Sequence, residues 1–265
     1  MSQKRKKSPV SGKAIIALAA LLFVLTITTL LYQREKPFLP NQLKTSLFSD
    51  VSQEDLKDNL VKSSIAYLES KGIMKGYPDG SFKPEKAVNR AEFLKILVAA
   101  LVPGELQDKK VICFSDVQIE DWFSKYVCYA KEKEWVTGYE DKTFKPANTI
   151  NQAEMMKMLV TAFGWDTDTF TDQKLPMSMD GEGWFVKYAK VILAKNIMTG
   201  AEMDSAKLVT RKEVAIIIFK SLLVDTLKID AYSEGKISDF FKLQNVVISG
   251  EPKPITVEPK PKSKK

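Results

Sequence analysis

The pattern of apolar and polar residues predicts a helix, a polar loop and a second helix early in the chain. The first helix is indicated by apolar residues at roughly helical spacing, Leu56, Leu60, Ile65 and Leu68. We expect this helix to end at Gly72. In the loop that follows, Pro78-Asp79-Gly80 favours a tight turn, and we expect Phe82 to fill the core beneath it.

The second helix begins near Asn89 and is apolar on most sides, so it requires burial on most sides. Two later stretches have the same character. Their apolar residues are Met155, Met156, Met158, Leu159, Val160 and Phe163 in one, and Val214, Ile216, Ile217, Ile218 and Phe219 in the other. We interpret these methionines and aromatic residues as core rather than as cofactor contacts. Three such helices are expected to pack into a shared bundle, with the first helices and the loops outside.

This helix-loop-helix unit recurs along the chain. Residues 72–92 match residues 134–154, and equivalent residues such as Gly76 and Gly138 are 62 positions apart. A third, weaker copy follows, in which Trp184 lies 62 positions beyond Trp122. An internal repeat of this period decides the architecture, so we predict a mainly α fold of three tandem repeats.

Composition narrows the function. The 265 residues are 45% apolar, enough for a buried core, and carry a formal charge of +7. The excess charge lies at the two ends, whereas residues 37–250 hold 28 basic and 30 acidic side chains. The repeats therefore form no general basic field, and we expect no nucleic-acid partner. Histidine is absent, which removes a common general base and metal ligand, so we expect no metal and no cofactor.

Residues 14–32 form an uncharged apolar stretch of 19 residues, about 28 Å long as a helix and close to the thickness of a bilayer core. Basic residues precede it, so the amino terminus is expected in the cytoplasm and the repeats outside. We favour an uncleaved anchor over a cleaved signal peptide, which would release a secreted protein, because Thr28 to Arg34 is a poor cleavage site.

Cys113 and Cys128 are the only cysteines. The predicted compartment permits a disulfide that would tie the loop at residues 114–117 to the following helix, and the sequence leaves bridged and free thiols equally open. A catalytic thiol is disfavoured because no histidine is present to activate it.

The second helices open with three related pentapeptides at residues 88–92, 150–154 and 209–213. Each is typical of a capping box, in which a side chain caps the helix amides and a glutamate reaches back to the N–H of the capping residue. The pairs are Asn89 with Glu92, Asn151 with Glu154, and Thr210 with Glu213.

A capping box does not explain Arg90 and Arg211, because the helix dipole opposes a cation in the first turn. Either an anionic ligand or a nearby acid would explain them, and the residues alone favour neither. Trp122 and Trp184, at the starts of first helices, can pack or stack on a sugar, and we favour packing.

These motifs together resemble the S-layer homology repeat. Phe48 to Val51 and Phe114 to Val117 share the sequence Phe-Ser-Asp-Val, and each is followed by Gly-Tyr-x-Asp-x-Ser/Thr-Phe-Lys-Pro and the pentapeptide. The third copy is similar in its helices but has a shortened loop that lacks Phe-x-Pro. The resemblance covers roughly residues 48–224.

The resemblance implies a pseudo-threefold domain around a central three-helix bundle, with grooves that bind anionic, often pyruvylated, secondary cell-wall polysaccharide or a peptidoglycan-linked glycan. It assigns ligand binding to Arg90 and Arg211, and places Gln152 at the equivalent position with no charge. Lys83 and Lys145 are candidate supporting cations. We expect one strong groove near Arg90.

The sequence thus predicts a membrane-anchored, non-catalytic module that ties the membrane to the wall or a surface layer. Docking of a surface protein is the alternative. A wall-glycan hydrolase that uses Glu92 and Asp79 is only a remote alternative, because both carboxylates already have local structural roles.

The predicted organisation is a cytoplasmic tail (1–13), a transmembrane signal-anchor (14–32), a linker (33–47), copy one (48–102), copy two (103–164), a degenerate copy three (165–224), and an extension (225–265). Within the extension, residues 237–248 are apolar enough to pack on the repeats. Residues 249–265 are predicted to be an extended, disordered tail.

Overall fold

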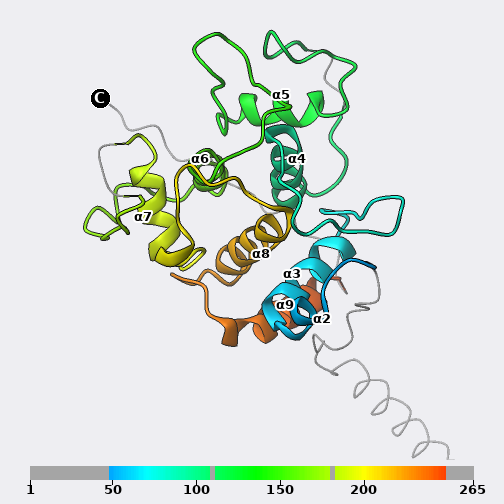
Figure 1. Ribbon diagram of the computed structural model, residues 1–265, viewed down its shortest axis with the longest axis vertical. Coiled ribbons are helices and arrows are strands. Elements are labelled where there is room, and N and C mark those ends of the chain that lie inside the picture. The colour runs from blue at the N-terminus through cyan, green and yellow to red at the C-terminus, as the bar shows by residue number, and fades with distance from the viewer. Residues whose placement is uncertain (1–47, 108–110, 180–182, 249–265) are drawn as a thin grey trace, which may run out of the picture. The chain divides into compact units, whose positions relative to one another are not determined.

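The computed structural model describes residues 48–107, 111–179 and 183–248 (Figure 1). The predicted segments at 1–13, 14–32, 33–47 and 249–265 lie outside the described residues. No helix in the described part is both long and apolar enough to cross a membrane.

The described residues are mainly helical, as predicted, and contain isolated bridges but no strand. Copy one holds α2 (Gln53–Lys57), α3 (Asn59–Ser70) and α4 (Arg90–Leu101), and copy two holds α5 (Ser124–Glu132) and α6 (Gln152–Ala162). Copy three holds α7 (Val186–Ala194), the short 3-10 helix η2 (Gly200–Glu202) and α8 (Arg211–Leu227). The 3-10 helix η3 (Glu234–Lys236) and α9 (Ile237–Ile248) follow.

The single first helix expected in copy one is divided into α2 and α3 at Asp58. This residue has extended backbone geometry, and its Oδ1 accepts hydrogen bonds from the amides of Leu60 at 2.7 Å and Val61 at 3.3 Å. An aspartate that caps a new helix in this way competes with continuation of the old one. The break therefore has a local cause.

Helices α4, α6 and α8 lie near the middle of the repeats in Figure 1, and α4 packs against both of the others. Their inward side chains are fully buried, among them Phe93, Leu94, Leu97, Met155, Met156, Leu159, Ile218 and Phe219. The interpretation as core is confirmed for Met155, Met156, Met158 and Phe219, whereas Phe163, at the end of α6, is only half-buried.

Each outer helix packs on the inner helix of the preceding copy. Thus α5 lies against α4, and α7 lies against α6. The most extensive of these contacts joins α3 of copy one to α8 of copy three (Figure 1). The first and last copies are therefore in contact, and the three copies form a closed ring.

Backbone hydrogen bonds close the same ring just before the inner helices begin. The Val88 amide donates to the Val209 carbonyl at 3.0 Å, the Val209 amide to the Ile150 carbonyl at 3.2 Å, and the Ile150 amide to the Val88 carbonyl at 3.0 Å. All three side chains are fully buried. The amino ends of α4, α6 and α8 are thereby held together.

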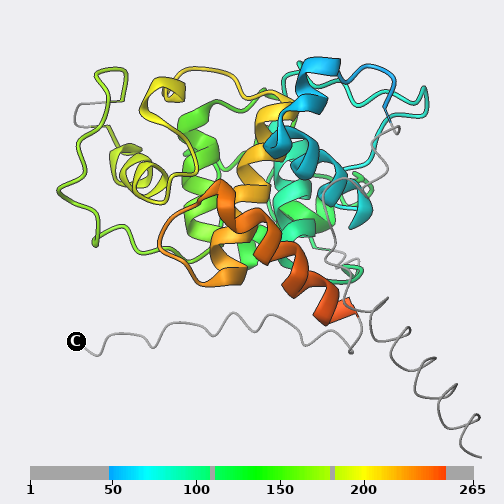
Figure 2. The ribbon, with the colours of Figure 1, turned by 90° about the horizontal axis from the view of Figure 1, so that it is seen from below.

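Helix α9 packs against α8, as Figure 2 also shows, and this confirms the prediction that residues 237–248 pack on the repeats. Phe240 and Phe241 are buried there, with ring centroids 5.0 and 5.9 Å from that of Tyr67. Phe219 of α8 completes the aromatic cluster.

Candidate functional site

The loops of copies one and two are built in the same way. The carboxylate of Asp50 accepts hydrogen bonds from the amides of Phe82 at 2.7 Å and Lys83 at 2.8 Å. In copy two, Asp116 accepts equivalent bonds from Phe144 and Lys145, both at 2.8 Å. The aspartate of each Phe-Ser-Asp-Val motif thus holds the loop, and the loop phenylalanine is fully buried beneath it, as predicted for Phe82.

The glycine that opens each loop is covered by a ring. A Cβ on Gly76 would lie 2.1 Å from Cε1 of Phe48, and one on Gly138 would lie 2.4 Å from Cε1 of Phe114. Gly138 also has a φ of +76°, which L side chains rarely adopt. Glycine at these positions lets the first residue of each Phe-Ser-Asp-Val motif pack on the loop.

Complete capping boxes begin α4, α6 and α8, on the residues that the sequence indicated. In each box, one carboxylate oxygen of the glutamate accepts from the backbone amide of the capping residue. The second oxygen remains for another partner.

The third pentapeptide residue holds the loop of the next copy around the ring. Nε of Arg90 donates to the Phe144 carbonyl at 2.9 Å, and Nε of Arg211 donates to the Phe82 carbonyl at 2.7 Å. The two arginines are 5% and 7% exposed. Sequence reasoning missed this clamping role because the loop that each arginine holds is 54 or 129 residues away along the chain.

Gln152 performs the same task without charge. Its Nε2 donates to the Glu202 carbonyl at 3.0 Å, and its Oε1 accepts from the Asp204 amide at 2.8 Å. The residue is 1% exposed. Both polar ends of the side chain are thus used by the copy-three loop, and contact between Gln152 and a sugar stays a prediction.

Each buried guanidinium is also held between two aromatic rings. Cζ of Arg90 lies 4.8 Å from the ring centroid of Tyr139 and 4.9 Å from that of Phe144. Cζ of Arg211 lies 4.9 Å from both Tyr77 and Phe82. Cation–π contacts favour a desolvated guanidinium, so this arrangement offsets part of the cost of burial.

Lys83 and Lys145 lie on the outer sides of the two loops. Their ammonium groups are 4.2 and 4.1 Å from the ring centroids of Tyr77 and Tyr139, and they pair with Asp79 at 3.3 Å and Asp141 at 3.5 Å. These ion pairs are exposed and contribute little to stability. A role for either lysine toward a ligand stays a prediction.

A hollow of about 290 Å³ lies beside Arg90, where all three copies contribute side chains. Copy two provides residues 135–139 with Glu154, Lys157 and Met158, and copy three provides Trp184. Arg90 Nη1 lies 3.1 Å from Glu154 Oε1, which also accepts a hydrogen bond from the Tyr139 hydroxyl. The Lys157 ammonium is 5.5 Å from the Trp184 ring. The hollow therefore combines the Trp184 ring, the Lys157 ammonium, which has no ion-pair partner among the described residues, and a guanidinium neutralised by Glu154.

The preference for packed tryptophans is wrong. Trp122 is 57% exposed and Trp184 is 56% exposed, and each meets the neighbouring Phe123 or Phe185 edge-on. Both residues precede the first turn of an outer helix, and more than half of each residue is open to solvent. These two tryptophans offer stacking surfaces that the sequence pattern undervalued.

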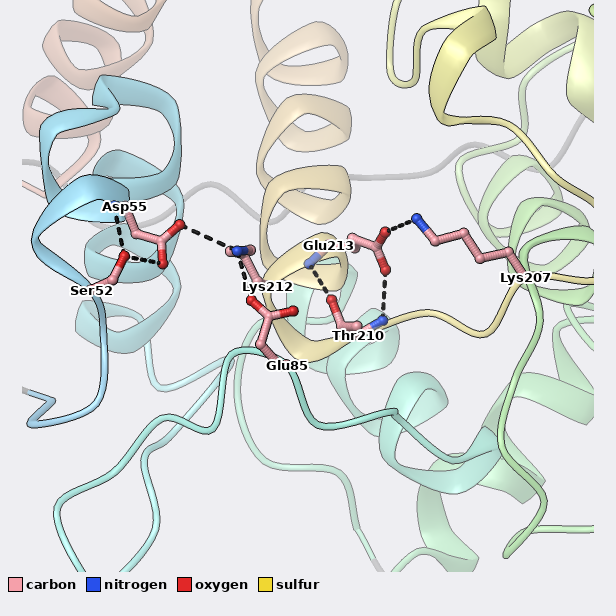
Figure 3. A network of polar contacts seen from close by, with 7 residues as sticks. All are labelled: Ser52, Asp55, Glu85, Lys207, Thr210, Lys212 and Glu213. Atoms are coloured by element: carbon pink, nitrogen blue, oxygen red, sulfur yellow. Dashed lines mark hydrogen bonds and ion pairs between the residues drawn. The ribbon is translucent and has the colours of Figure 1, made fainter.

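Polar contacts reinforce the junction between copies three and one. Figure 3 shows Lys212, at the start of α8, between Asp55 at 3.3 Å and Glu85 at 2.7 Å. Burial opposes ionisation of Asp55, but the hydrogen bond from Ser52 and the pairing with Lys212 outweigh it and lower its pKa. The hydrogen bond to Glu85, joined by that to Asp55, raises the pKa of Lys212 despite partial burial. The equivalent residues of copies one and two are Ala91 and Ala153, which cannot form an ion pair.

Cys113 and Cys128 form a disulfide with an S–S distance of 2.03 Å. It ties the residue before Phe114 to the middle of α5. Neither cysteine is therefore available as a nucleophile.

The carboxylates of the remote hydrolase alternative are both committed locally. Hydrogen bonds from the Ser81 hydroxyl and amide lower the pKa of Asp79 to about 2, so it stays ionised and is a poor general acid. Glu92 accepts from the Asn89 amide and pairs with Lys86. The described residues contain no group of three or more side chains suited to a metal ion.

Comparison with known proteins now adds to this geometry. Residues 61–94 and 114–156 match the S-layer homology domain. The chain is 32% identical over 150 residues to a surface layer protein of Brevibacillus choshinensis, covering 56% of this chain and 13% of that protein. It is 36% identical over 110 residues to a middle cell wall protein of Brevibacillus brevis, covering 40% of this chain and 10% of that protein.

A cellulosome-anchoring protein of Acetivibrio thermocellus is 32% identical over 114 residues, which are 42% of this chain and 26% of that protein. The chain thus spans only a minor part of the length of each of these relatives. The matched segments coincide with the two copies that have the complete loop and its buried phenylalanine. The first two repeats therefore contain S-layer homology domain sequence.

Proposed function

We propose that this protein is a non-catalytic module of the cell envelope whose repeats bind an anionic cell-wall polysaccharide in the grooves between copies. The names of its relatives support a surface or wall location, since they include a surface layer protein, a cell wall protein and an anchoring protein. In this proposal the closed ring of copies is a pseudo-threefold domain, and pyruvylated sugars are among its ligands. Residues 14–32 hold it in the membrane, with the repeats facing the wall.

The observation that carries the proposal is the hollow beside Arg90. The exposed ring of Trp184 suits the apolar face of a sugar ring, and Lys157 next to it can donate hydrogen bonds to sugar oxygens. The Tyr139 hydroxyl and the Glu154 carboxylate line the same hollow and suit sugar hydroxyls. Because residues from all three copies meet there, the site depends on the closed ring.

Co-sedimentation of the full chain with purified wall sacculi tests the proposal. Trp184→Ala is expected to weaken binding about tenfold, because it removes the stacking face but touches no core residue. Met177→Ala is a matched control, since Met177 is 95% exposed and lies outside the hollow. Wild-type chain that stays in the supernatant, or equal binding by both variants, would contradict the proposal.

A second candidate is docking of a surface protein. It is favoured by Val111 and Ile112, two adjacent apolar residues that are 55% and 63% exposed on the segment leading to Cys113. Chain that stays on the cell surface after the wall polymer has been stripped, and is released by Val111→Ser with Ile112→Ser, would support this function instead.

A further inference from the structure

The three capping glutamates use their second carboxylate oxygen differently. Glu92 pairs with Lys86 at 3.0 Å, and Glu213 pairs with Lys207 at 2.7 Å. In each case the lysine lies six residues before the glutamate. The equivalent residue in copy two is Asn148, which carries no charge. Glu154 instead pairs with Arg90 at 3.1 Å.

The two arginines are otherwise placed alike. Both donate from Nε to the carbonyl of a buried phenylalanine, and both lie 4.8 to 4.9 Å from the flanking ring centroids. They differ at the terminal nitrogens. Nη2 of Arg211 donates to the Lys75 carbonyl at 3.1 Å, and Arg211 has no ion-pair partner in the described part of the chain. The difference between the arginines therefore follows from the partner of the glutamate.

The surroundings of Arg211 are also more cationic. Lys95 is half-buried, donates to the Ile73 carbonyl at 2.8 Å, and has a pKa lowered by burial and then by the charges of Lys75 and Arg211. Lys75 and Arg211 thus both act on the charge of Lys95. In copy two, the residue equivalent to Lys75 is the neutral Thr137. Among the described residues Arg211 and Lys95 form no ion pair, whereas Arg90 is neutralised by Glu154.

We propose that the residue six positions before the capping glutamate decides which groove recognises an anionic group. Lys86 occupies Glu92 and leaves Arg211 free to attract a carboxylate or phosphate of a saccharide. Asn148 leaves Glu154 to neutralise Arg90, so the guanidinium there no longer attracts an anionic group. This inference rests on the proposed wall-polysaccharide function, and it assigns the acidic groups of the polymer to the Arg211 groove.

The test uses oligogalacturonate as the anionic probe and its methyl ester as the neutral one, with the full chain. Lys86→Asn is expected to weaken oligogalacturonate binding about tenfold, because Glu92 is released to pair with Arg211. Adding Glu92→Gln to that variant restores binding, since glutamine still completes a capping box but carries no charge. Asn148→Lys is expected to strengthen oligogalacturonate binding by releasing Arg90. Binding of the methyl ester stays unchanged in all of them.

Two controls separate this mechanism from a general loss of positive charge. Lys83→Asn removes a charge beside the same Tyr77 ring but leaves Lys86 on Glu92, so its effect is expected to be much smaller. Lys207→Asn breaks the same kind of ion pair in copy three, where the facing residue is Gln152, and is expected to have no effect. Equal losses in Lys86→Asn and Lys83→Asn, or no recovery with Glu92→Gln, would overturn the inference.

Crystal structures of the variants decide the inference even if the proposed function fails. Lys86→Asn should bring Glu92 within ion-pair distance of Arg211, and Asn148→Lys should draw Glu154 away from Arg90. If wild-type chain binds neither sacculi nor oligogalacturonate but these pairs exchange as described, the wall-binding function is wrong and the inference on charge partition stands. Unchanged pairs would refute the inference itself.

Discussion

Copies two and three hold their loops with different side chains. In copy two, Phe144 fills the core, Asp116 accepts from the loop amides, and Arg90 donates to the loop carbonyl. In copy three, Met203 is the buried residue, the Ser178 hydroxyl donates to its carbonyl, and Gln152 provides the clamp.

The backbone nevertheless keeps one register. The Ala91 amide donates to the Pro146 carbonyl in copy two, and the Ala153 amide donates to the Ser205 carbonyl in copy three. Pro146 and Ser205 each lie five residues before the capping residue of the next inner helix, which is Asn151 or Thr210. The fold thus requires a buried apolar side chain and one donor to the loop, and the charge of the arginine is an addition that only some copies have.

The largest expected effect is removal of the buried loop residue. Phe144→Ala leaves a cavity under the copy-two loop and is expected to lower the free energy of unfolding by about 4 kcal/mol. Met203→Ala removes a smaller side chain at the equivalent place and should cost less. Denaturant unfolding measures both. Equal and small losses would show that the loops do not seal the core.

Much of this arrangement was visible in the sequence. The helices, the capping boxes and the burial of Phe82 follow from periodicity, turn chemistry and the capping pairs, because each depends on residues close together in the chain. The sequence also singles out Arg90, because a cation is unfavourable at a helix amino terminus.

The partners of Arg90 could not be predicted from residues close to it in the chain. Its contacts with Phe144 and Glu154 arise only when the copies close into a ring, and the exposure of Trp184 depends on the place where α7 starts. The residue that replaces the loop phenylalanine in copy three was hidden for the same reason. Met203 carries no motif, and its burial becomes evident only in three dimensions.

The clamp itself provides the next prediction. Arg90→Ala leaves the Phe144 carbonyl and the Glu154 carboxylate without their buried partner, and is expected to cost about 3 kcal/mol of unfolding free energy. Arg90→Gln copies the solution that Gln152 uses in the next groove, so it should keep most of that stability. Thermal and denaturant unfolding of the two variants show whether Arg90 stabilises the protein through its hydrogen bond to the loop or through its charge. If glutamine is as damaging as alanine, the two grooves are not built on the same principle.

The disulfide is a further difference between the copies, since copy two is stapled and copies one and three are not. Replacing Cys113 and Cys128 with serine is expected to lower the free energy of unfolding by about 2 kcal/mol, because the bridge closes a 15-residue separation in the unfolded chain. The same loss should appear when wild-type protein is unfolded under reducing conditions. An unchanged midpoint would mean that α5 is fully held by its packing on α4.

The smallest expected effect concerns the ion pairs at the junction between copies three and one. Because the pKa of Asp55 is lowered, its contribution to the free energy of unfolding is complete above its unfolded pKa near 3.8. That contribution is lost as the pH falls through the folded pKa. The raised pKa of Lys212 means that its contribution is present below 10.5 and is lost as the pH rises through the folded value. Both contributions are therefore complete at neutral pH.

Lys212→Ala should accordingly cost about 1 kcal/mol at neutral pH, and this cost should shrink as the pH falls and Asp55 becomes protonated. Denaturant unfolding at pH 7 and at pH 2.5 provides the comparison. Lys83→Ala is the control, because the pair of Lys83 with Asp79 lies in open solvent and should leave stability unchanged at both values. If Lys212→Ala lost the same unfolding free energy in acid, the aliphatic stem of Lys212, and not its charge, would stabilise this junction.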